Sequence, residues 1–231
     1  MAMTLYDLAA ADPAIRFSPN CWRTRMAVAH KGLELDCRPW RFVDKDAIAF
    51  SDQGTVPVLV DGERTVYDSW QIALYLEERY PGRPHLFESR QARAHARFIN
   101  EWTAKVVHPG IIKQIILPLF EMLDEGDKDY FRTTREKAFG KTLEDFAADG
   151  EAALPAFRAS LTPLRGTLEV QDFLGGSSPS YADYVVFSAF QWARVSSPRD
   201  LLTAGDPIAA WRERMLGLFD GLGAAMPARA A

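Results

Sequence analysis

The first third of the chain alternates between strand-like and helix-like hydrophobic patterns. "MTLYDL" is a short apolar run of strand length, and "LELDCRPW" places Leu33, Leu35 and Cys37 at alternate positions, as a half-buried strand does. Between these runs, "SPNCWRTRMAVAHKG" begins with residues that suit a helix start and ends at Gly32. The order strand, helix, strand predicts a pair of parallel strands.

A hairpin and a second helix follow. "TVPVLVDGERTVYD" predicts two antiparallel strands around Asp61-Gly62, because this dipeptide favours a tight hairpin turn. "SWQIALYLEERY" then places Ile72, Tyr75 and Leu76 on one helical face, and a Pro-Gly pair stops the helix. We therefore expect a mixed four-stranded sheet with helices packed against it.

The pattern changes at "PGRPHLFESRQ", a Pro-rich stretch that predicts a linker. Beyond it the strand pattern disappears, and helices are expected over residues 90–123, 128–150, 155–170, 179–196 and 206–222. The sequence thus predicts an α/β domain over residues 1–83 and an all-helical domain over residues 90–231.

Composition narrows the class of partner. The 231 residues are 48% hydrophobic and 25% charged, with a net charge of -4, which favours a small-molecule partner over nucleic acid. The N-terminus lacks a secretory signal, and no apolar run is long enough to span a bilayer, so we expect a cytoplasmic protein without a membrane partner. The 2 cysteines and 4 histidines lack the spacing of a metal site.

Ser18 is the first candidate for chemistry, because it stands where the first helix begins. A helix N-terminus carries unpaired N–H groups and a partial positive charge, which favour a bound anion. A hydroxyl at this place can also donate a hydrogen bond to a thiolate and so lower the pKa of the thiol. The alternative is structural: Ser18 caps its own helix. The residues alone leave both open.

Two more motifs could hold an extended, peptide-like ligand. A cis bond between Val56 and Pro57 would expose the backbone N–H and C=O of Val56, although the proline could also simply initiate a strand. Asp68 and Ser69 open the next helix, where Ser69 can act as the cap and free N–H groups can hold a carboxylate. A plain helix start is the alternative there.

In this order the three motifs resemble the glutathione-binding domain of the glutathione transferases. That family joins a thioredoxin-like domain to an all-helical domain that binds the second, acceptor substrate. The resemblance implies that Ser18 stabilises the thiolate of glutathione, the co-substrate, and that Val56, before a cis Pro57, pairs its backbone with the cysteinyl unit. It also implies that Asp68 and Ser69 hold the γ-glutamyl end, and that the protein forms a homodimer.

Other residues match the family less directly. Arg41, in the loop after the second strand, suits the glycyl carboxylate of glutathione by its geometry, although Lys45 competes for this role. Gln53, just before "GTVP", could bond to the glutathione backbone. In the helical half, Ser180 and Asp183 of "PSYADY" are similar to the Ser-x-x-Asp capping box that opens the core helix in this family.

The finer resemblance points to two subgroups. "YDSWQIALYLEERYP", "LFESR" and "LFDGLG" resemble Ser-type transferases around the bacterial β-etherases and their fungal relatives. This implies a glutathione transferase acting on an apolar, aromatic electrophile, with β-aryl-ether cleavage as one form. "SPNCWRTR" is also similar to the zeta class, the maleylacetoacetate isomerases, but has Ser-Pro-Asn where that class has Ser-Ser-Cys. The alternatives are therefore a zeta-type isomerase and a non-enzymatic homologue that binds ligands.

Three residues near these motifs have more than one interpretation. Cys21 lies one turn into the first helix, where we expect a lowered thiol pKa and where a redox role is conceivable. Arg23 is interpreted as a solvated or packing residue of the same helix, with lining of the site as the alternative. His108 is interpreted as solvated or packed, and the alternative is that it faces the interdomain cleft, where we expect the acceptor site.

Overall fold

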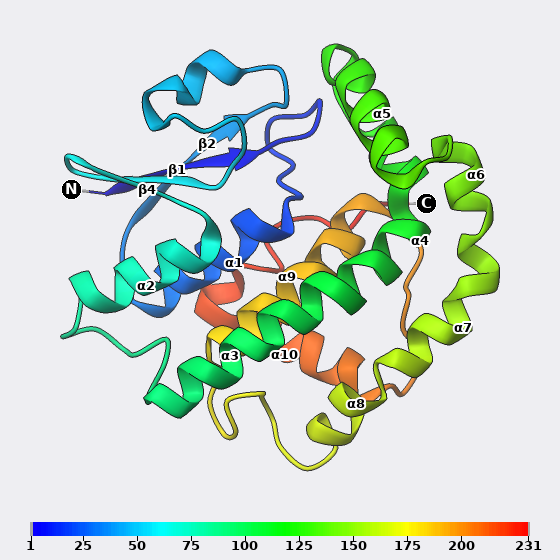
Figure 1. The fold of residues 1–231 in the computed structure, drawn as a ribbon. Helices are drawn as coiled ribbons and strands as arrows, with labels where there is room; N and C mark the ends of the chain where they lie inside the picture. Colours follow the sequence, from blue (N-terminus) through cyan, green and yellow to red (C-terminus); the bar gives the residue numbers. More distant parts are fainter. Residues whose placement is uncertain (1, 231) are drawn as a thin grey trace.

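The structure of residues 2–230 is a computed structural model that begins with a small sheet and continues as a helical domain (Figure 1). Its first elements are strand β1 (Met3–Leu8), helix α1 (Pro19–His30), strand β2 (Leu35–Trp40), a 3-10 helix (Lys45–Ser51), strands β3 (Val58–Asp61) and β4 (Arg64–Tyr67), and helix α2 (Ser69–Arg79). These elements follow the predicted order.

The sheet is mixed, as the sequence predicts. The strand order is β2-β1-β3-β4, with β1 parallel to β2 and antiparallel to β3, and with β3 antiparallel to β4. Asp61 pairs with Arg64, so the hairpin loop is Gly62 and Glu63, one residue later than the expected centre. Gly62 has a φ of 60°, which glycine adopts without the steric cost that other residues meet.

The rest of the chain is helical. Its helices are α3 (Arg90–Trp102), α4 (His108–Glu121), α5 (Glu125–Phe139), α6 (Leu143–Ala148), α7 (Gly150–Ser160), α8 (Thr162–Leu168), α9 (Tyr181–Ser196) and α10 (Pro207–Gly221). The predicted architecture, a mixed four-stranded sheet followed by an all-helical domain, is confirmed. The boundary expected between residues 83 and 90 falls between α2 and α3, and the division into domains there stays a prediction. Within the described residues, no helix is both long and apolar enough to cross a membrane.

Three expected helices are subdivided in the structure. The span 90–123 contains a π-helical turn, Thr103–Val107, between α3 and α4. The span 128–150 is broken after α5, because Gly140 takes a left-handed conformation with a φ of 67° and Thr142 then caps α6. The span 155–170 is divided between α7, which begins earlier than expected, and α8. Hydrophobic periodicity continues across such breaks, so it does not reveal them.

Helix α9 joins the two halves of the molecule. It packs against α1, α3 and α4, and lies in the middle of the helical part in Figure 1, whereas α5, α6 and α7 form the right-hand edge. At one end of α1, the Tyr184 hydroxyl donates to His30 Nδ1 at 2.5 Å, because Nε2 of the same ring lies 2.9 Å from the His85 carbonyl and carries the proton. Burial lowers the pKa of His30, which keeps this ring neutral.

Two further bonds hold the sheet domain against the helices. The Tyr181 hydroxyl donates to the carbonyl of Ser69 at 2.8 Å, across the first turn of α2. Arg23 of α1 donates to Asn100 of α3 at 2.7 Å, and its side chain is buried rather than solvated, so the packing interpretation is the correct one of that pair. The position of α1 and α2 therefore depends on the helical domain.

The carboxylate of Asp183 organises the start of α9. It is fully buried and accepts the N–H groups of Leu174 at 2.7 Å, Gly175 at 3.1 Å and Ser180 at 2.9 Å. The Ser180 hydroxyl at 3.0 Å and the Trp211 indole N–H at 3.1 Å complete the set. The predicted capping box is present, and it extends to the loop before α9 and to α10.

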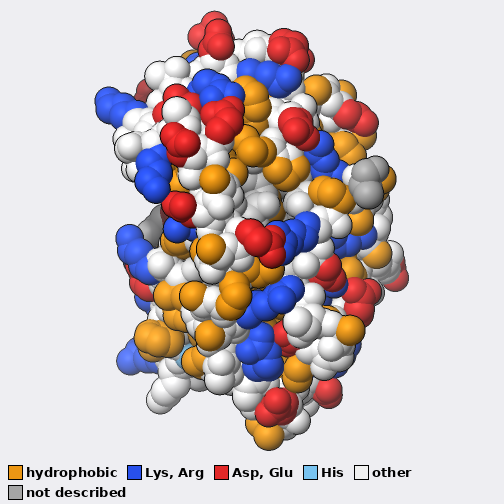
Figure 2. Space-filling model, turned by 90° about the vertical axis from the view of Figure 1, so that its right-hand side faces the viewer, with side chains coloured by type: hydrophobic (Ala, Val, Ile, Leu, Met, Phe, Trp, Pro, Cys, Tyr) orange, Lys and Arg blue, Asp and Glu red, His pale blue; other side chains and the backbone are white. Residues whose placement is uncertain are grey.

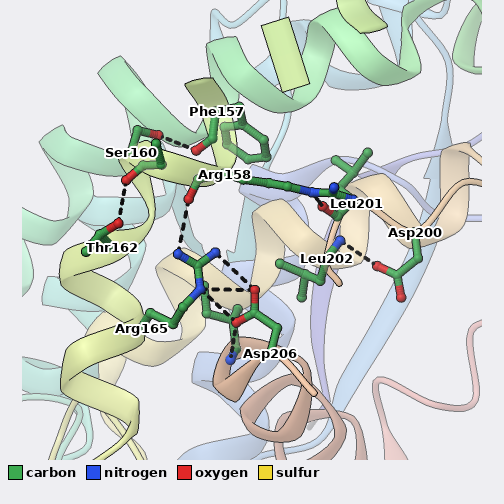
Figure 3. A network of polar contacts seen from close by, with 11 residues as sticks. Phe157, Arg158, Ser160, Thr162, Arg165, Asp200, Leu201, Leu202 and Asp206 are labelled. Carbon is green, nitrogen blue, oxygen red and sulfur yellow. Dashed lines mark hydrogen bonds and ion pairs between the residues drawn. The ribbon is translucent and has the colours of Figure 1, made fainter. Parts of the chain in front are cut away.

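A second polar network ties α8 to the beginning of α10 (Figure 3). Arg165 binds the buried carboxylate of Asp206 through Nη2 at 3.0 Å, and Asp206 also accepts the N–H of Ile208 at 3.0 Å, which caps α10. Arg158 of α7 donates to the Leu201 carbonyl at 2.8 Å. These bonds tie α7 and α8 to the loop before α10 and to the start of α10.

Asp183→Ala tests how much the hydrogen bonds to Asp183 contribute to the free energy of unfolding. The substitution leaves buried backbone donors without an acceptor, and we expect it to lower the free energy of unfolding by about 3 kcal/mol or more. Urea unfolding followed by circular dichroism measures this loss. Asp129→Ala is the control, because it removes an exposed carboxylate of α5 and should change stability by less than about 0.5 kcal/mol. If the two substitutions lowered the free energy of unfolding equally, the stabilising role of Asp183 at the start of α9 would be wrong.

Candidate functional site

A cavity of about 720 Å³ is lined by residues from both halves of the chain. From the sheet domain it takes the start of α1 and the segments before β3 and after β2, and from the helical domain it takes α4, α5, α6 and α9. Many of its walls are aromatic: Phe17, Trp40, Phe42, Tyr130, Phe131, Phe139, Phe146 and Trp192. A cavity of this size and character suits a small apolar molecule.

Ser18 lines this cavity at the N-terminus of α1. Its Oγ accepts the backbone N–H of Cys21 at 3.4 Å, so the structural interpretation of Ser18 as a helix cap is correct. The cap uses only a lone pair of the oxygen, whereas a hydroxyl has two lone pairs and one proton. Its O–H therefore remains available to donate to a group in the cavity, and the two interpretations of Ser18 are compatible.

The bond between Val56 and Pro57 is cis. Val56 and Thr55 line the cavity together with Ser18, directly before β3. The structure thus brings two of the predicted site motifs, the Ser18 turn and the Val56 segment, to the wall of one cavity.

Asp68, rather than Ser69, caps α2. Its Oδ1 accepts the N–H groups of Trp70 and Gln71, both at 3.0 Å, and Ser69 is the first residue of the helix. Asp and Ser are both good helix caps, so the sequence alone does not distinguish Asp68 from Ser69, and the cap expected at Ser69 is wrong. Asp68 has a φ of 63°, a left-handed backbone conformation that is uncommon for a residue other than glycine. Among the bonds of the described residues, Asp68 Oδ2 accepts none.

Arg23 interacts electrostatically both with Asp68 and with a residue of the cavity wall. Its guanidinium is buried, which lowers its pKa, and the carboxylate of Asp68 partly offsets this effect. The same guanidinium acts electrostatically on His108, which lines the cavity. Neither Asp68 nor Ser69 lines the cavity itself, so they lie beyond its wall at the start of α2.

The structure does not bring Arg41 and Gln53 to the cavity wall. The Arg41 guanidinium forms ion pairs with Asp124 at 2.7 Å and Asp44 at 3.5 Å. The Gln53 amide donates to the Ser51 carbonyl at 3.4 Å, within its own loop. The roles expected for Arg41 and Gln53 therefore stay predictions.

The expected lowering of the Cys21 thiol pKa is wrong. Its side chain is fully buried, and this burial raises the pKa of the thiol well above its usual range, with the nearby carboxylate of Asp7 adding to the effect. Desolvation disfavours the thiolate more strongly than the helix N-terminus favours it. The sequence shows that Cys21 lies in the first turn but not that the turn faces the core, so it could not reveal this outcome.

His108 is both packed and part of the cavity wall. Its ring meets Trp192 edge to face, with 5.8 Å between the ring centroids. Burial, together with a smaller contribution from the charge of Arg23, lowers the pKa of His108 to about 3, so the imidazole is neutral at physiological pH.

Sequence reasoning missed several residues of the cavity. Asn20 and Thr55 lie close to Ser18 and Val56 in the sequence, in motifs where only these neighbours were predicted to act. Lys113 interrupts the apolar run "GIIKQIILPLF", and a lone cation in such a run could have indicated a residue of the cavity. Arg135 stands among other charged residues of α5 and gives no such signal. Within residues 2–230, no three His, Cys, Asp or Glu side chains gather as a metal ion requires.

Known protein families match both halves of the chain. The family described as "Glutathione S-transferase, N-terminal domain" matches residues 13–84, and the family described as "Glutathione S-transferase, C-terminal domain" matches residues 94–216. The glutathione S-transferase zeta class protein of Euphorbia esula is 35% identical over 101 residues, which cover 41% of this chain and 43% of that protein. The chain spans about half the length of the curated relatives it matches.

Solved structures are similar over almost the whole chain. Glutathione transferase GSTFuA3 from Phanerochaete chrysosporium has a TM-score of 0.78 and 27% identity, covering 98% of this chain and 94% of that one. The glutathione S-transferase CsGST63524 of Ceriporiopsis subvermispora, solved in complex with glutathione, has a TM-score of 0.79 and 25% identity, covering 95% and 97%.

His108→Phe should make stability less dependent on pH. In the folded protein the pKa of His108 is about 3, below the usual value of 6.5, so only the unfolded state takes up a proton as the pH falls through this window. Neutral His108 therefore stabilises the fold fully above pH 6.5, and this stability is lost at lower pH. Between pH 7 and pH 5 the wild type should lose about 2 kcal/mol more than the variant in urea unfolding.

The control for this measurement is His95→Gln, which replaces an exposed histidine of α3 and should keep the wild-type dependence on pH. If wild type and His108→Phe lose the same free energy of unfolding between the two pH values, the assignment of a neutral, buried His108 is wrong.

Proposed function

Because the chain belongs to the glutathione S-transferase family, we propose that it activates the thiol of glutathione as a thiolate and directs it at an apolar, aromatic electrophile. The observation that carries this proposal is the place of Ser18, which lines the cavity at the N-terminus of α1 with a hydroxyl whose oxygen accepts the Cys21 N–H and whose O–H can donate to a thiolate. Lowering a thiol pKa from about 8.5 to near 7 takes about 2 kcal/mol, which a hydroxyl donor and a helix N-terminus can together supply.

Each part of glutathione has a proposed partner. Val56 pairs its backbone with the cysteinyl unit, which puts the thiol next to Ser18 on the same wall. At the γ-glutamyl end, the free Oδ2 of Asp68 accepts the ammonium group, and Ser69 with the N-terminus of α2 holds the carboxylate. The unusual φ of Asp68 supports this role, because residues held in strained conformations cluster at functional sites.

At the glycyl end we retain Arg41 and Gln53 as the proposed partners. Binding there requires Arg41 to share or exchange its ion pair with Asp124. The five donors of a guanidinium allow it to hold both carboxylates at once.

The electrophile occupies the aromatic part of the cavity. The thiolate attacks one of its carbon atoms and a leaving group departs, and the protein contributes thiolate stabilisation and positioning. The likeness to Ser-type transferases around the bacterial β-etherases makes an aryl ether one such electrophile, with the phenolate as leaving group. We also propose that the protein acts as a homodimer, as the family resemblance implies.

A zeta-type isomerase is the second candidate, because the similarity to a zeta class protein favours it. The two activities differ in the fate of glutathione. A transferase consumes one glutathione for each product, whereas an isomerase adds the thiolate, rotates a bond and releases glutathione unchanged. A third candidate, a homologue that binds apolar ligands without turnover, predicts neither outcome.

Ser18→Ala tests thiolate activation by kinetics. Loss of a hydrogen bond to a charged group costs about 1.5–3 kcal/mol, so kcat with a chloronitrobenzene should fall about 10- to 150-fold. The glutathione affinity, measured by calorimetry, should change by less than about threefold because the other contacts remain. Ser177→Ala, at an exposed serine, is the control. Unchanged turnover in Ser18→Ala would remove Ser18 from the mechanism, and a wild type without turnover would favour the ligand-binding candidate.

Asp68→Asn tests the γ-glutamyl site separately. Asparagine also caps helices and tolerates a positive φ, so the fold should be kept while the negative charge is lost. We expect the dissociation constant for glutathione to rise about tenfold, as for loss of one charged hydrogen bond. A glutathione analogue without the amino group should bind wild type and variant equally. If the variant weakens both ligands alike, Asp68 does not contact the ammonium group.

A further inference from the structure

The wall of the cavity carries two cationic side chains and no acidic one among the described residues. Lys113 comes from α4 and Arg135 from α5. The third titratable nitrogen group on the wall, His108, is neutral. A cavity with aromatic walls and uncompensated positive charge is suited to an aromatic anion rather than to a purely apolar molecule.

Arg135 lacks a counter-ion in the described part of the chain. Its guanidinium lies 5.0 Å from the ring centroid of Phe131 and 5.8 Å from that of Phe42, and its Nη1 donates to the Thr134 hydroxyl at 3.2 Å. Burial lowers the pKa of Arg135. A guanidinium has five N–H donors, so most of them remain for a ligand.

The neighbouring arginine on the same helix is different. Arg132 binds Glu144 through two nitrogens at 2.8 and 2.9 Å and binds Glu136 at 2.9 Å. Figure 2 looks at the side of the molecule where α5, α6 and α7 lie, and acidic and basic side chains are mixed there. The outer surface of this region therefore balances its charges, while the cavity wall does not.

Lys113 has no ion pair within the described residues either. Its ammonium group lies 5.7 Å from the ring centroid of Phe146, on α6. The ion pair with Lys141 at 2.9 Å is the main cause that lowers the pKa of Asp149, and the charge of Lys113 only adds to it, so the Asp149 carboxylate is paired with Lys141 rather than with Lys113. Lys113 thus adds positive charge to the cavity as a point charge, without the planar geometry of Arg135.

We propose that the acceptor substrate of this protein is an aromatic acid, whose ring lies among the aromatic walls and whose carboxylate is bound by Arg135 with the support of Lys113. The planar fork of a guanidinium binds a carboxylate through two parallel hydrogen bonds, which also fixes the orientation of the ring. This inference rests on the proposed function in one respect: it takes the cavity beside Ser18 as the acceptor site.

Glutathione also carries carboxylates, so it is an alternative ligand for Arg135 and Lys113. All of the residues proposed to bind glutathione belong to the sheet domain, whereas Lys113 and Arg135 belong to α4 and α5 of the helical domain. If Arg135 held glutathione instead, its loss would weaken glutathione and leave the aromatic acid unaffected.

The test is the binding of 2-naphthoate and of its methyl ester, followed by quenching of intrinsic tryptophan fluorescence without glutathione, since Trp40 and Trp192 line the cavity. Wild type should bind the acid at least about tenfold more tightly than the ester. Arg135→Gln should raise the dissociation constant of the acid about tenfold or more, as expected for loss of a charge-assisted bidentate pair. It should change the dissociation constant of the ester by less than about threefold. Lys113→Gln should weaken the acid by a smaller factor.

Lys137→Gln is the matched control, because it removes a cation from the exposed side of the same helix and should leave both ligands unchanged. Thermal unfolding checks that each variant is folded. The proposal is overturned if the wild type binds the ester and the acid equally tightly, or if Arg135→Gln weakens the binding of both alike. It is also overturned if Arg135→Gln weakens the binding of glutathione instead of the acid, or if Lys137→Gln weakens the binding of the acid as much as Arg135→Gln does. Since the assay needs no thiolate, failure of Ser18 as the activating group would leave it intact, so the two proposals can fail separately.

Discussion

The hydrogen bond from the Cys21 N–H to the Ser18 oxygen decides what Ser18 can do. Because the cap occupies one lone pair of the oxygen and leaves the O–H unused, the hydroxyl can cap α1 and donate to a group in the cavity at the same time. This arrangement depends on α1 being held in place from outside the sheet domain. Tyr184 fixes its far end through His30, and Asn100 binds Arg23 near its beginning. The helical domain is therefore a mechanical support for the site as well as one wall of its cavity.

Burial then determines which other groups can take part. It keeps the Cys21 thiol protonated and the His108 imidazole neutral, so neither competes with Ser18 as an ionised group. The charge that remains around the cavity is positive, from Lys113 and Arg135. Positive charge near the acceptor favours an anionic ligand and also favours a thiolate over a thiol. The same electrostatic setting thus serves both substrates of the proposed reaction.

Local sequence signals predicted the elements that carry the site. Period-two and helical patterns, the hairpin dipeptide and the Ser180–Asp183 box are each decided within a few residues, so the four strands and the main helices could be found without a structure. Tertiary contacts could not. Asp124, far along the chain, takes up Arg41 in an ion pair. The burial of Cys21 depends on how α1 lies against the rest of the protein, and the cap at Asp68 rather than Ser69 is a choice between two adjacent residues of equally suitable type.

The most direct test of the central claim is an ultraviolet titration of the glutathione thiolate bound to the wild type and to Ser18→Ala. The account predicts that the pKa of the bound thiol falls from about 8.5 to near 7 in the wild type, and that this shift is lost when the hydroxyl is removed. A bound thiol that titrates like the free one in the wild type would contradict the account and reduce Ser18 to a helix cap.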